Sequence, residues 1–276
     1  MRLASIAALL LLLLVGCTGL MQNIGARWVT RQLATEFDLN DAQTAETRAS
    51  VDRLIAKAPE VIGPPVDLIV ASTDRAIAKG MTEQDLIGIE KQVDALLNDV
   101  AGPVIDEAAP ILATLNDAQI DHASARFDKR FEELREKLAE PADERLEERQ
   151  DKFIEAIEEW TGYLTDSQEQ SLRAYVARFP DDGSVQLTAD EGHIDDIEKA
   201  LRQHPGPQGV HAALWQAWNA REDWGPNARS PAERRAENRK TLLYIYGMLD
   251  NQQKANASAH LHELHAKLKR FLGLVA

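Results

Sequence analysis

The sequence predicts an all-α fold, a multi-helix bundle of amphipathic helical hairpins with no sheet, on three grounds. Apolar residues recur at spacings of three and four over several long segments, as they do on one face of an amphipathic helix. Aromatic residues make up 5% of the chain and charged residues 28%, and the abundant Ala, Leu, Glu, Gln and Arg favour helices. No strand-like alternation is long enough to build a sheet.

The chain opens with the pattern of an export signal. The apolar run from Ile6 to Val15 is shorter than the roughly 20 apolar residues that span a membrane, and it ends in "LVGC", which resembles a bacterial lipobox. Cys17 is the only cysteine, so we expect cleavage before it and acylation, for example with palmitate. The alternative is an ordinary signal peptide with Cys17 incidental. The expected division is a signal peptide at 1–16, a lipid anchor and tether at 17–27, and one helical domain at 28–276.

The N-terminal third contains one expected break. Gly63, Pro64 and Pro65 interrupt the apolar run "VIGPPVDLIV". We expect helices on both sides of this break, although the run also fits a short strand.

In the middle of the chain, residues 116–139 and 142–162 each show one apolar face, with Pro141 between them. These segments form either a helical hairpin or one kinked helix. A further helix, lined by Leu172 and Val176, should stop before "FPDDG".

The last third contains two capping-box patterns, Thr188 with Glu191 and Ser230 with Glu233, and each predicts a helix start. We expect the final two helices at about 230–247 and 250–272. The segments "HPGPQG" and "WGPNARS" should be loops because they are rich in Gly and Pro.

A pentapeptide, "LNDAQ", occurs at 39–43 and again at 115–119. Related strings are "MTEQD" at 81–85, "LTDSQ" at 164–168 and "LDNQQ" at 249–253. The second residue is suited to cap a helix, and the residue three positions later can bond back to the cap backbone. The leading apolar residue fits a hydrophobic staple in only some copies, such as Leu115 with Ile120. The strings therefore predict helix starts, and their uneven spacing excludes a regular solenoid.

The net charge of −14 argues against nucleic-acid binding, which depends on clustered Lys and Arg. The charge is unevenly distributed: residues 121–170 hold sixteen acids and eight bases, whereas residues 221–276 hold six acids and ten bases. We expect these two segments to attract each other. The alternative is that the basic segment contacts anionic lipid headgroups.

Two groups of residues suggest binding chemistry. In "HLHELH", His262 and His265 share one helix face while His260 and Glu263 lie on the opposite side, so a metal site is not expected. Three tryptophans are expected to pack in the core; a carbohydrate platform is the alternative. They are Trp215, Trp218 and Trp224.

A stripe of acids at intervals of four is either a docking face for a cationic partner or a solvated face relieved by Arg145, Arg149 and Lys152. The stripe consists of Glu147, Asp151, Glu155 and Glu159. No nucleophile motif and no Gly-rich phosphate loop occurs, so we expect no catalytic residue and no cofactor.

The ordered motifs resemble a Gram-negative lipoprotein family called domain of unknown function 6279. The likeness is carried by "FDLNDAQ", "TLNDAQIDHASARFDKRFEELRE", "RLEERQDKFIEAIEEWTGYLTDSQ" and "SPAERRAENRKTLLYIYGMLDNQQ". In these strings the family tends to carry Thr and Pro or Glu where this chain has Asn and Asp. The pentapeptide is more distantly similar to that of the periplasmic LTxxQ proteins of the Spy and CpxP type, which have chaperone or sensor-damping roles.

These observations predict an outer-membrane lipoprotein facing the periplasm. An Asp directly after the lipidated cysteine would resemble an inner-membrane retention signal, but here Thr18 follows Cys17. We expect a non-enzymatic binding protein, chaperone-like, whose partners are envelope proteins or unfolded clients. The alternatives are an assembly adaptor with one dedicated partner and a hydrolase with paired carboxylates.

Overall fold

The computed structural model describes residues 20–274, where the chain forms ten α-helices and no strand, so the all-α prediction is confirmed. Residues 1–16 and Cys17 lie outside the described residues. None of the described helices is both long enough and apolar enough to cross a membrane. The helices are α2 (Leu20–Phe37), α3 (Asp41–Lys79), α4 (Glu83–Leu112), α5 (Asp117–Ala139), α6 (Ala142–Thr161), α7 (Asp166–Val176), α8 (Gly183–Arg202), α9 (Gly206–Ala220), α10 (Pro231–Met248) and α11 (Asn251–Phe271).

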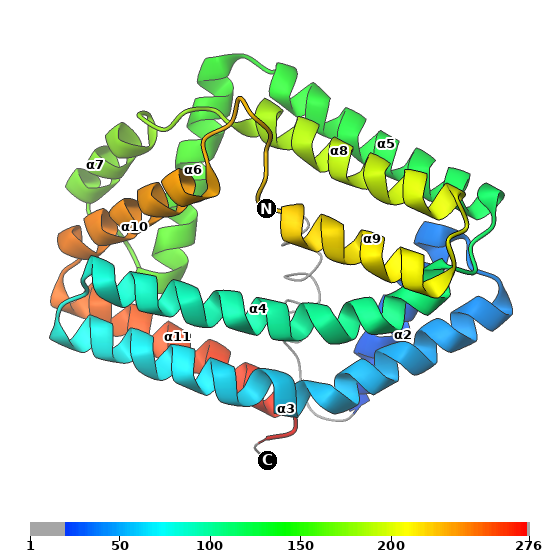
Figure 1. Ribbon diagram of the computed structural model, residues 1–276. Coiled ribbons are helices and arrows are strands. Elements are labelled where there is room, and N and C mark those ends of the chain that lie inside the picture. Colours follow the sequence, from blue (N-terminus) through cyan, green and yellow to red (C-terminus); the bar gives the residue numbers. More distant parts are fainter. Residues whose placement is uncertain (1–19, 275–276) are drawn as a thin grey trace.

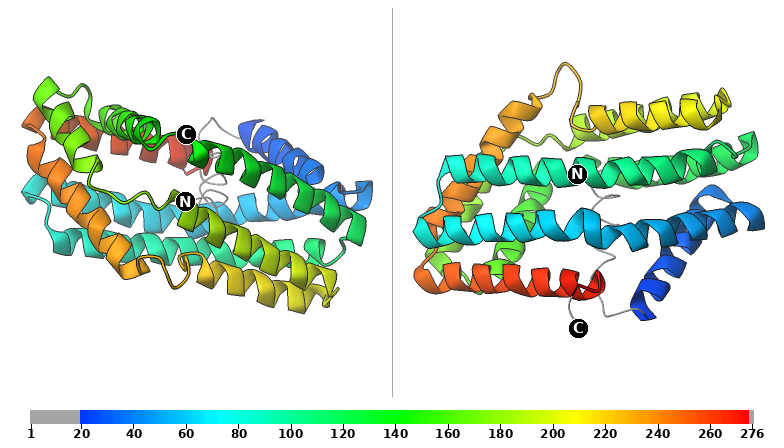
Figure 2. Two further views of the ribbon diagram at one scale, coloured as in Figure 1. Left: turned by 90° about the horizontal axis from the view of Figure 1, so that it is seen from above. Right: turned by 60° about the horizontal axis from the view of Figure 1, so that its bottom comes forward.

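Four of the other described helices pack against the long α3–α4 hairpin (Figure 1). α2 and α11 lie on α3, whereas α9 and α10 lie on α4. Among the remaining helices, α8 packs on α5 and α9, and α6 packs on α7 and α11. Figure 2 shows the same arrangement from two further directions.

The buried apolar side chains gather in separate clusters at the places where helix ends meet. One joins the end of α4 to the start of α5 and the α8–α9 turn, and comprises Ala109, Leu115, Ile120, Leu201 and Val210. A second joins α6 and α7 to the start of α11, and comprises Ile154, Ile157, Leu164, Leu172 and Leu249. A third joins α3, α4 and the end of α11, and comprises Ile62, Leu96, Phe271 and Leu272.

All five pentapeptides begin helices with a complete capping box, as predicted. In the first copy, the Asn40 side chain accepts a hydrogen bond from the backbone N–H of Gln43 at 2.9 Å, and Gln43 Oε1 accepts one from the backbone N–H of Asn40 at 3.0 Å. These bonds satisfy donors that a helix start otherwise leaves free.

Four copies also bond to one another in two pairs. Gln43 Nε2 donates to Gln119 Oε1 at 3.2 Å and Gln119 Nε2 donates to Gln43 Oε1 at 2.7 Å. Gln168 and Gln253 exchange the same two bonds, at 2.8 and 3.0 Å. We call these two contacts the glutamine crossings. Each joins helix starts that are more than 70 residues apart in the sequence.

The second amide hydrogen of each glutamine reaches the carbonyl just before the partner motif. Gln43 donates to the Thr114 carbonyl at 3.1 Å and Gln119 to the Asp38 carbonyl at 2.8 Å. The second crossing repeats the pattern, because Gln168 donates to Met248 and Gln253 donates to Tyr163. Each side-chain amide thus uses both of its N–H donors and both acceptor positions of its oxygen. These hydrogen bonds offset the free energy that is lost when the amide is removed from water.

The leading leucines of the motif enter the core beside the crossings. Leu115 belongs to the first cluster, with Leu39 packed against it, while Leu164 and Leu249 belong to the second. The leucine therefore packs each of these helix starts against the core. Leu115 and Ile120 lie in the same cluster, which is consistent with the hydrophobic staple predicted for them.

The predicted break at Gly63, Pro64 and Pro65 is wrong. α3 runs through all three residues and through Pro59, and Figure 1 shows it bending there. A proline removes one intrahelical bond and kinks a helix, but packing can hold both halves in place. Here Ile62 belongs to the third cluster, and a Cβ on Gly63 would lie 2.8 Å from Leu274 Cδ1.

Neither interpretation of residues 116–162 is correct. α5 ends at Ala139 and α6 begins at Ala142, so the helix is interrupted, yet the two helices do not pair as a hairpin. α5 packs on α8 and α2, whereas α6 packs on α11 and α7. The second glutamine crossing holds α7 against the start of α11, which is far from the partners of α5.

Two local predictions in the last third are also wrong. α8 begins at Gly183, so Thr188 lies inside the helix and donates to the Ser184 carbonyl at 3.1 Å instead of capping. α9 begins at Gly206, so the expected "HPGPQG" loop is mostly helical. The Ser230 capping box, the "WGPNARS" loop and the last two helices are as predicted.

Candidate functional site

The histidines of α11 face two different helices. His262 lies 2.7 Å from Asp74 and His265 lies 2.6 Å from Asp67, both on α3, as expected for one shared face. His260 contacts the Trp160 ring of α6 edge-on, with centroids 4.8 Å apart. Lys269, and then His265, hold the pKa of Asp67 below its usual value. Within residues 20–274, no group of three or more His, Cys, Asp or Glu side chains is placed to hold a metal ion.

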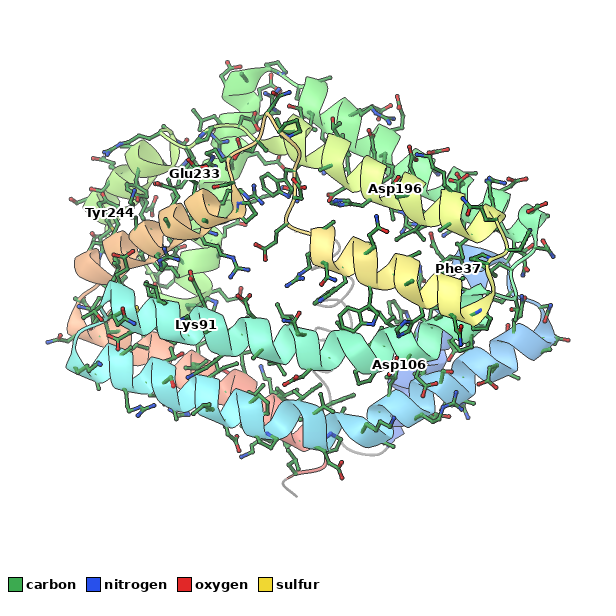
Figure 3. All side chains as sticks on the ribbon, in the orientation of Figure 1. Phe37, Lys91, Asp106, Asp196, Glu233 and Tyr244 are labelled. Atoms are coloured by element: carbon green, nitrogen blue, oxygen red, sulfur yellow. The ribbon has the colours of Figure 1, made fainter. Side chains whose placement is uncertain are left out.

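The tryptophans of α9 are half-buried between α9 and α4. Trp218 Nε1 donates to Asn98 Oδ1 at 2.9 Å, and the Arg221 guanidinium covers the Trp218 ring at 4.1 Å. About two turns before Trp218, His211 of α9 lies 3.1 Å from Asp106 of α4, which is labelled in Figure 3. Trp224, beyond the end of α9, lies under the Arg234 guanidinium. Packing thus accounts for these rings.

The acidic stripe of α6 is mostly solvated. Glu147, Glu155 and Glu159 are exposed, and Asp151 pairs with Arg173 of α7 at 2.7 Å. Arg145 and Lys152 were expected to reduce the repulsion within this stripe, but they pair with acids outside it: Arg145 with Asp181 and Lys152 with Glu148.

The basic C-terminal segment pairs with a different acidic region from the one expected. Arg235 pairs with Asp94, Arg239 pairs with Glu90 at 2.8 Å, and Lys269 pairs with Asp67 at 2.9 Å. These acids belong to α3 and α4, on which α10 and α11 pack. The predicted attraction between residues 121–170 and residues 221–276 is therefore wrong, because the bases of the C-terminal segment pair with acids of the helices on which they pack.

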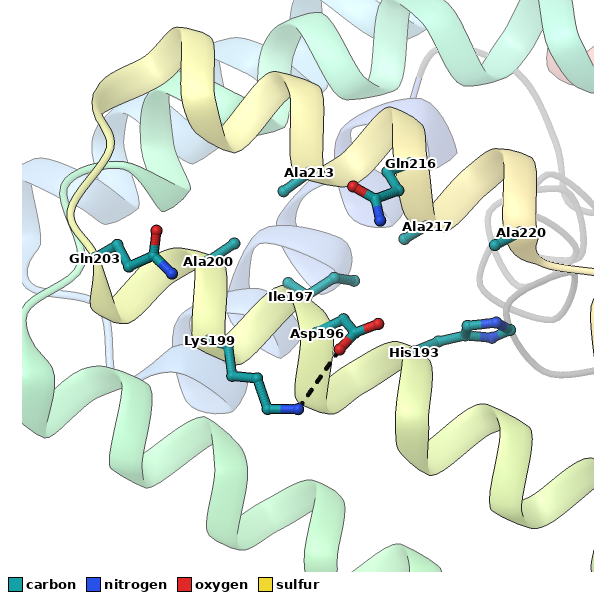
Figure 4. Close-up of a pocket in the computed structure, with 10 residues that line it drawn as sticks. All are labelled: His193, Asp196, Ile197, Lys199, Ala200, Gln203, Ala213, Gln216, Ala217 and Ala220. Carbon is teal, nitrogen blue, oxygen red and sulfur yellow. Dashed lines mark ion pairs between the residues drawn. The ribbon is translucent and has the colours of Figure 1, made fainter. Parts of the chain in front are cut away.

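Two grooves open on the surface of the described helices. One, of about 280 Å³, lies between α8 and α9 and is floored by alanines (Figure 4). Asp196 and Lys199 form an ion pair at its rim, 3.5 Å apart, and Gln203 and His193 stand toward its two ends. The other, of about 550 Å³, lies between α3 and α4 beside the "MTEQD" helix start. Ser72, the one hydroxyl residue that lines either groove, accepts hydrogen bonds from Arg75 and Gln92 and contacts no general base.

The most exposed aromatic side chain of residues 25–274 lies at the C-terminal end of α6. Tyr163 is 93% exposed, and Trp160, three residues earlier, is 38% exposed. The backbone between them is fixed, because Gly162 ends α6 with φ at 78° and the Tyr163 carbonyl accepts the bond from Gln253. We call these two rings the aromatic edge, together with the acids Glu155, Glu159 and Asp166, which are exposed in the same stretch of sequence.

Sequence reasoning did not identify the aromatic edge. The one available signal was the position of Tyr163 between a helix-ending Gly162 and the motif "LTDSQ", where a large apolar ring has no helix face to pack on. Tyr and Trp are the residues that most often dominate protein interfaces, and rings held on a rigid loop bind with little loss of entropy. The geometry therefore suits binding of a polypeptide.

Comparison with known proteins gives one match. Residues 66–229 match the family described as "Family of unknown function (DUF6279)", and this range includes two of the four strings that suggested the resemblance. No curated protein and no solved structure matches the chain. Because the match covers more than half of the 276 residues, the chain belongs to the DUF6279 family.

Proposed function

We propose that the protein is a lipid-anchored lipoprotein of the periplasmic face of the outer membrane that binds other polypeptides without catalysing a reaction. The aromatic edge is the observation that carries the binding role. A Tyr ring that is 93% exposed on a loop with a fixed backbone is already positioned for contact, and Tyr and Trp contribute most strongly to binding at protein interfaces. The exposed acids beside it favour partners with basic as well as apolar residues.

The proposed binding is chaperone-like, with unfolded envelope proteins as clients. Other large apolar side chains are exposed on separate helices, including Leu68 on α3 and Leu242 on α10, at 52% and 49%. Apolar contacts spread over several helices suit extended clients that touch many points. The likeness of the pentapeptide to the LTxxQ proteins supports the same role. The alternative is an adaptor that binds one dedicated partner through the aromatic edge alone.

Site-specific crosslinking in cells tests the binding role. A photoreactive phenylalanine replaces Tyr163, and the same residue at Leu242 serves as a second position on a different helix. We expect crosslinks from position 163 to many unfolded envelope proteins. A single stoichiometric partner would identify an adaptor instead. An absence of protein crosslinks from position 163, together with normal crosslinking from position 242, would contradict the role of the aromatic edge.

The lipid anchor has its own test. Cys17→Ser should leave the protein unprocessed or release it from the membrane fraction, because a bacterial lipoprotein depends on acylation of this cysteine. If the variant is processed and membrane-bound like the wild type, the anchor proposal is wrong. Sucrose-gradient separation of the two membranes tests the outer-membrane assignment in the same cells.

A further inference from the structure

The start of α2 and the end of α11 lie side by side at the bend of α3. Figure 1 and both views of Figure 2 bring the two helix ends together, and Leu274 lies over Gly63 at the bend. Because the turn at residues 38–40 reverses the chain, α2 and α3 pack in opposite directions, and the start of α2 lies toward the bend of α3. Cys17 precedes the first residue of α2 by only three positions. This end of the fold is therefore the end nearest the proposed anchor.

The outer face of α2 at this end combines one ring and two cations. Ala26 and Thr30 are buried against the fold, whereas Arg27, Trp28 and Arg31 are exposed, with Trp28 at 44%. Residues three and four apart on a helix are neighbours, so Arg31 lies beside both Arg27 and Trp28. Trp and Arg are the side chains that favour the boundary between a bilayer and water.

The other two elements add apolar and basic side chains. Leu274 is 42% exposed after the end of α11. The segments 27–31, 57–67 and 263–270 together hold six bases and three acids. This local excess of positive charge contrasts with the net charge of −14 of the whole chain. Anionic headgroups attract such a surface.

We infer that this end of the fold, Arg27, Trp28 and Arg31 with Leu274 and the basic end of α11, rests on the bilayer and contacts anionic phospholipid headgroups. The inference rests on the proposed lipid anchor for its location, but it adds a second, non-covalent contact. The contact fixes how the helical fold is oriented on the membrane.

Tryptophan quenching by brominated lipid tests the contact. The chain from Cys17 to Ala276 is coupled through its single cysteine to a maleimide phospholipid, which anchors it whether or not cells acylate Cys17. It is inserted into phosphatidylethanolamine–phosphatidylglycerol vesicles with or without brominated acyl chains. We expect bromine to quench the wild type, Trp28→Phe to lose most of that quenching, and Trp160→Phe to lose little. Equal quenching in the wild type and Trp28→Phe would overturn the inference.

The charged part of the contact has a matched control. Arg27→Gln/Arg31→Gln should reduce quenching in these vesicles, whereas Lys129→Gln/Lys240→Gln, which removes two exposed bases elsewhere, should not. Circular dichroism verifies that each variant is folded. If bromine quenches the tryptophan fluorescence of both double variants equally, the contact between these arginines and the headgroups is refuted, even if Trp28 itself reaches the lipid. Since the anchor is supplied chemically, a failure here is separate from a failure of Cys17 acylation.

Discussion

Gln43 and Gln119 bond to each other through both atoms of their side-chain amides, 76 residues apart in the sequence. Each amide also accepts from its own cap backbone and donates to the carbonyl before the partner motif. Only an amide has two donors and an acceptor that takes two bonds, so glutamine is required at this position. Asp85 in "MTEQD" and Glu233 at the Ser230 cap have no N–H to donate, and both cap without crossing.

Gln43→Glu should lower the free energy of unfolding by about 1–3 kcal/mol, because a carboxylate cannot donate to the Thr114 carbonyl and leaves buried acceptors facing each other. Chemical denaturation measures the change. Gln84→Glu is the matched control, since Gln84 is exposed in the related motif. If Gln43→Glu lowers the free energy of unfolding by no more than Gln84→Glu does, the crossing does not stabilise the fold.

A double-mutant cycle should separate the two crossings. Once Gln43→Leu has left the Gln119 amide unpaired, Gln119→Leu should cost less than it does alone, giving a coupling energy of about 0.5–3 kcal/mol. Gln43→Leu combined with Gln253→Leu should be additive, because the two crossings lie in different apolar clusters. Unfolding free energies of the single and double variants provide both values. Equal coupling in the two combinations would contradict independent crossings.

Two glycines should respond to alanine in opposite directions. A Cβ on Gly209 would lie 2.4 Å from the Pro205 Cβ, and the proline ring has little freedom to move, so Gly209→Ala should lower the melting temperature. Gly192 lies in the exposed interior of α8 with open space around its Cβ position. Gly192→Ala should raise stability by about 0.5–1 kcal/mol through helix propensity. Calorimetry on both variants checks the contrast.

The cap at the start of α4 should depend on pH. Lys79, and then Thr82, lower the pKa of Asp85 from 3.8 to about 2. A depressed carboxyl pKa means that its stabilising contribution is fully present above pH 3.8 and is lost as the pH falls through about 2. Asp85→Asn should therefore be less stable than the wild type at pH 7 and nearly equal to it at pH 2. Asp166→Asn, at an exposed first-turn position, should not show this convergence. Melting temperatures measured from pH 7 to pH 2 decide the outcome.

The sequence by itself determined the helical class and most helix starts, because a capping box joins residues three apart and needs no distant partner. Asn116 with Gln119 and Ser230 with Glu233 begin helices as their spacing predicts. Thr188 with Glu191 shows the limit of that rule, since the helix already begins at Gly183 and the same letters fall inside it. The exposed position of Tyr163 was likewise not visible in the sequence, because exposure depends on which helices pack nearby.

Only the tertiary structure decided which helix starts meet. All five motif copies cap locally in the same way, but the Gln43–Gln119 and Gln168–Gln253 crossings depend on bonds across more than 70 residues, which no local spacing encodes. Packing also holds α3 together through Pro64 and Pro65, and sends α5 and α6 to different partners across Pro141. Local hydrogen bonds fix where the capped helices begin, whereas burial of apolar faces and the pairing of amides fix which helices pack together.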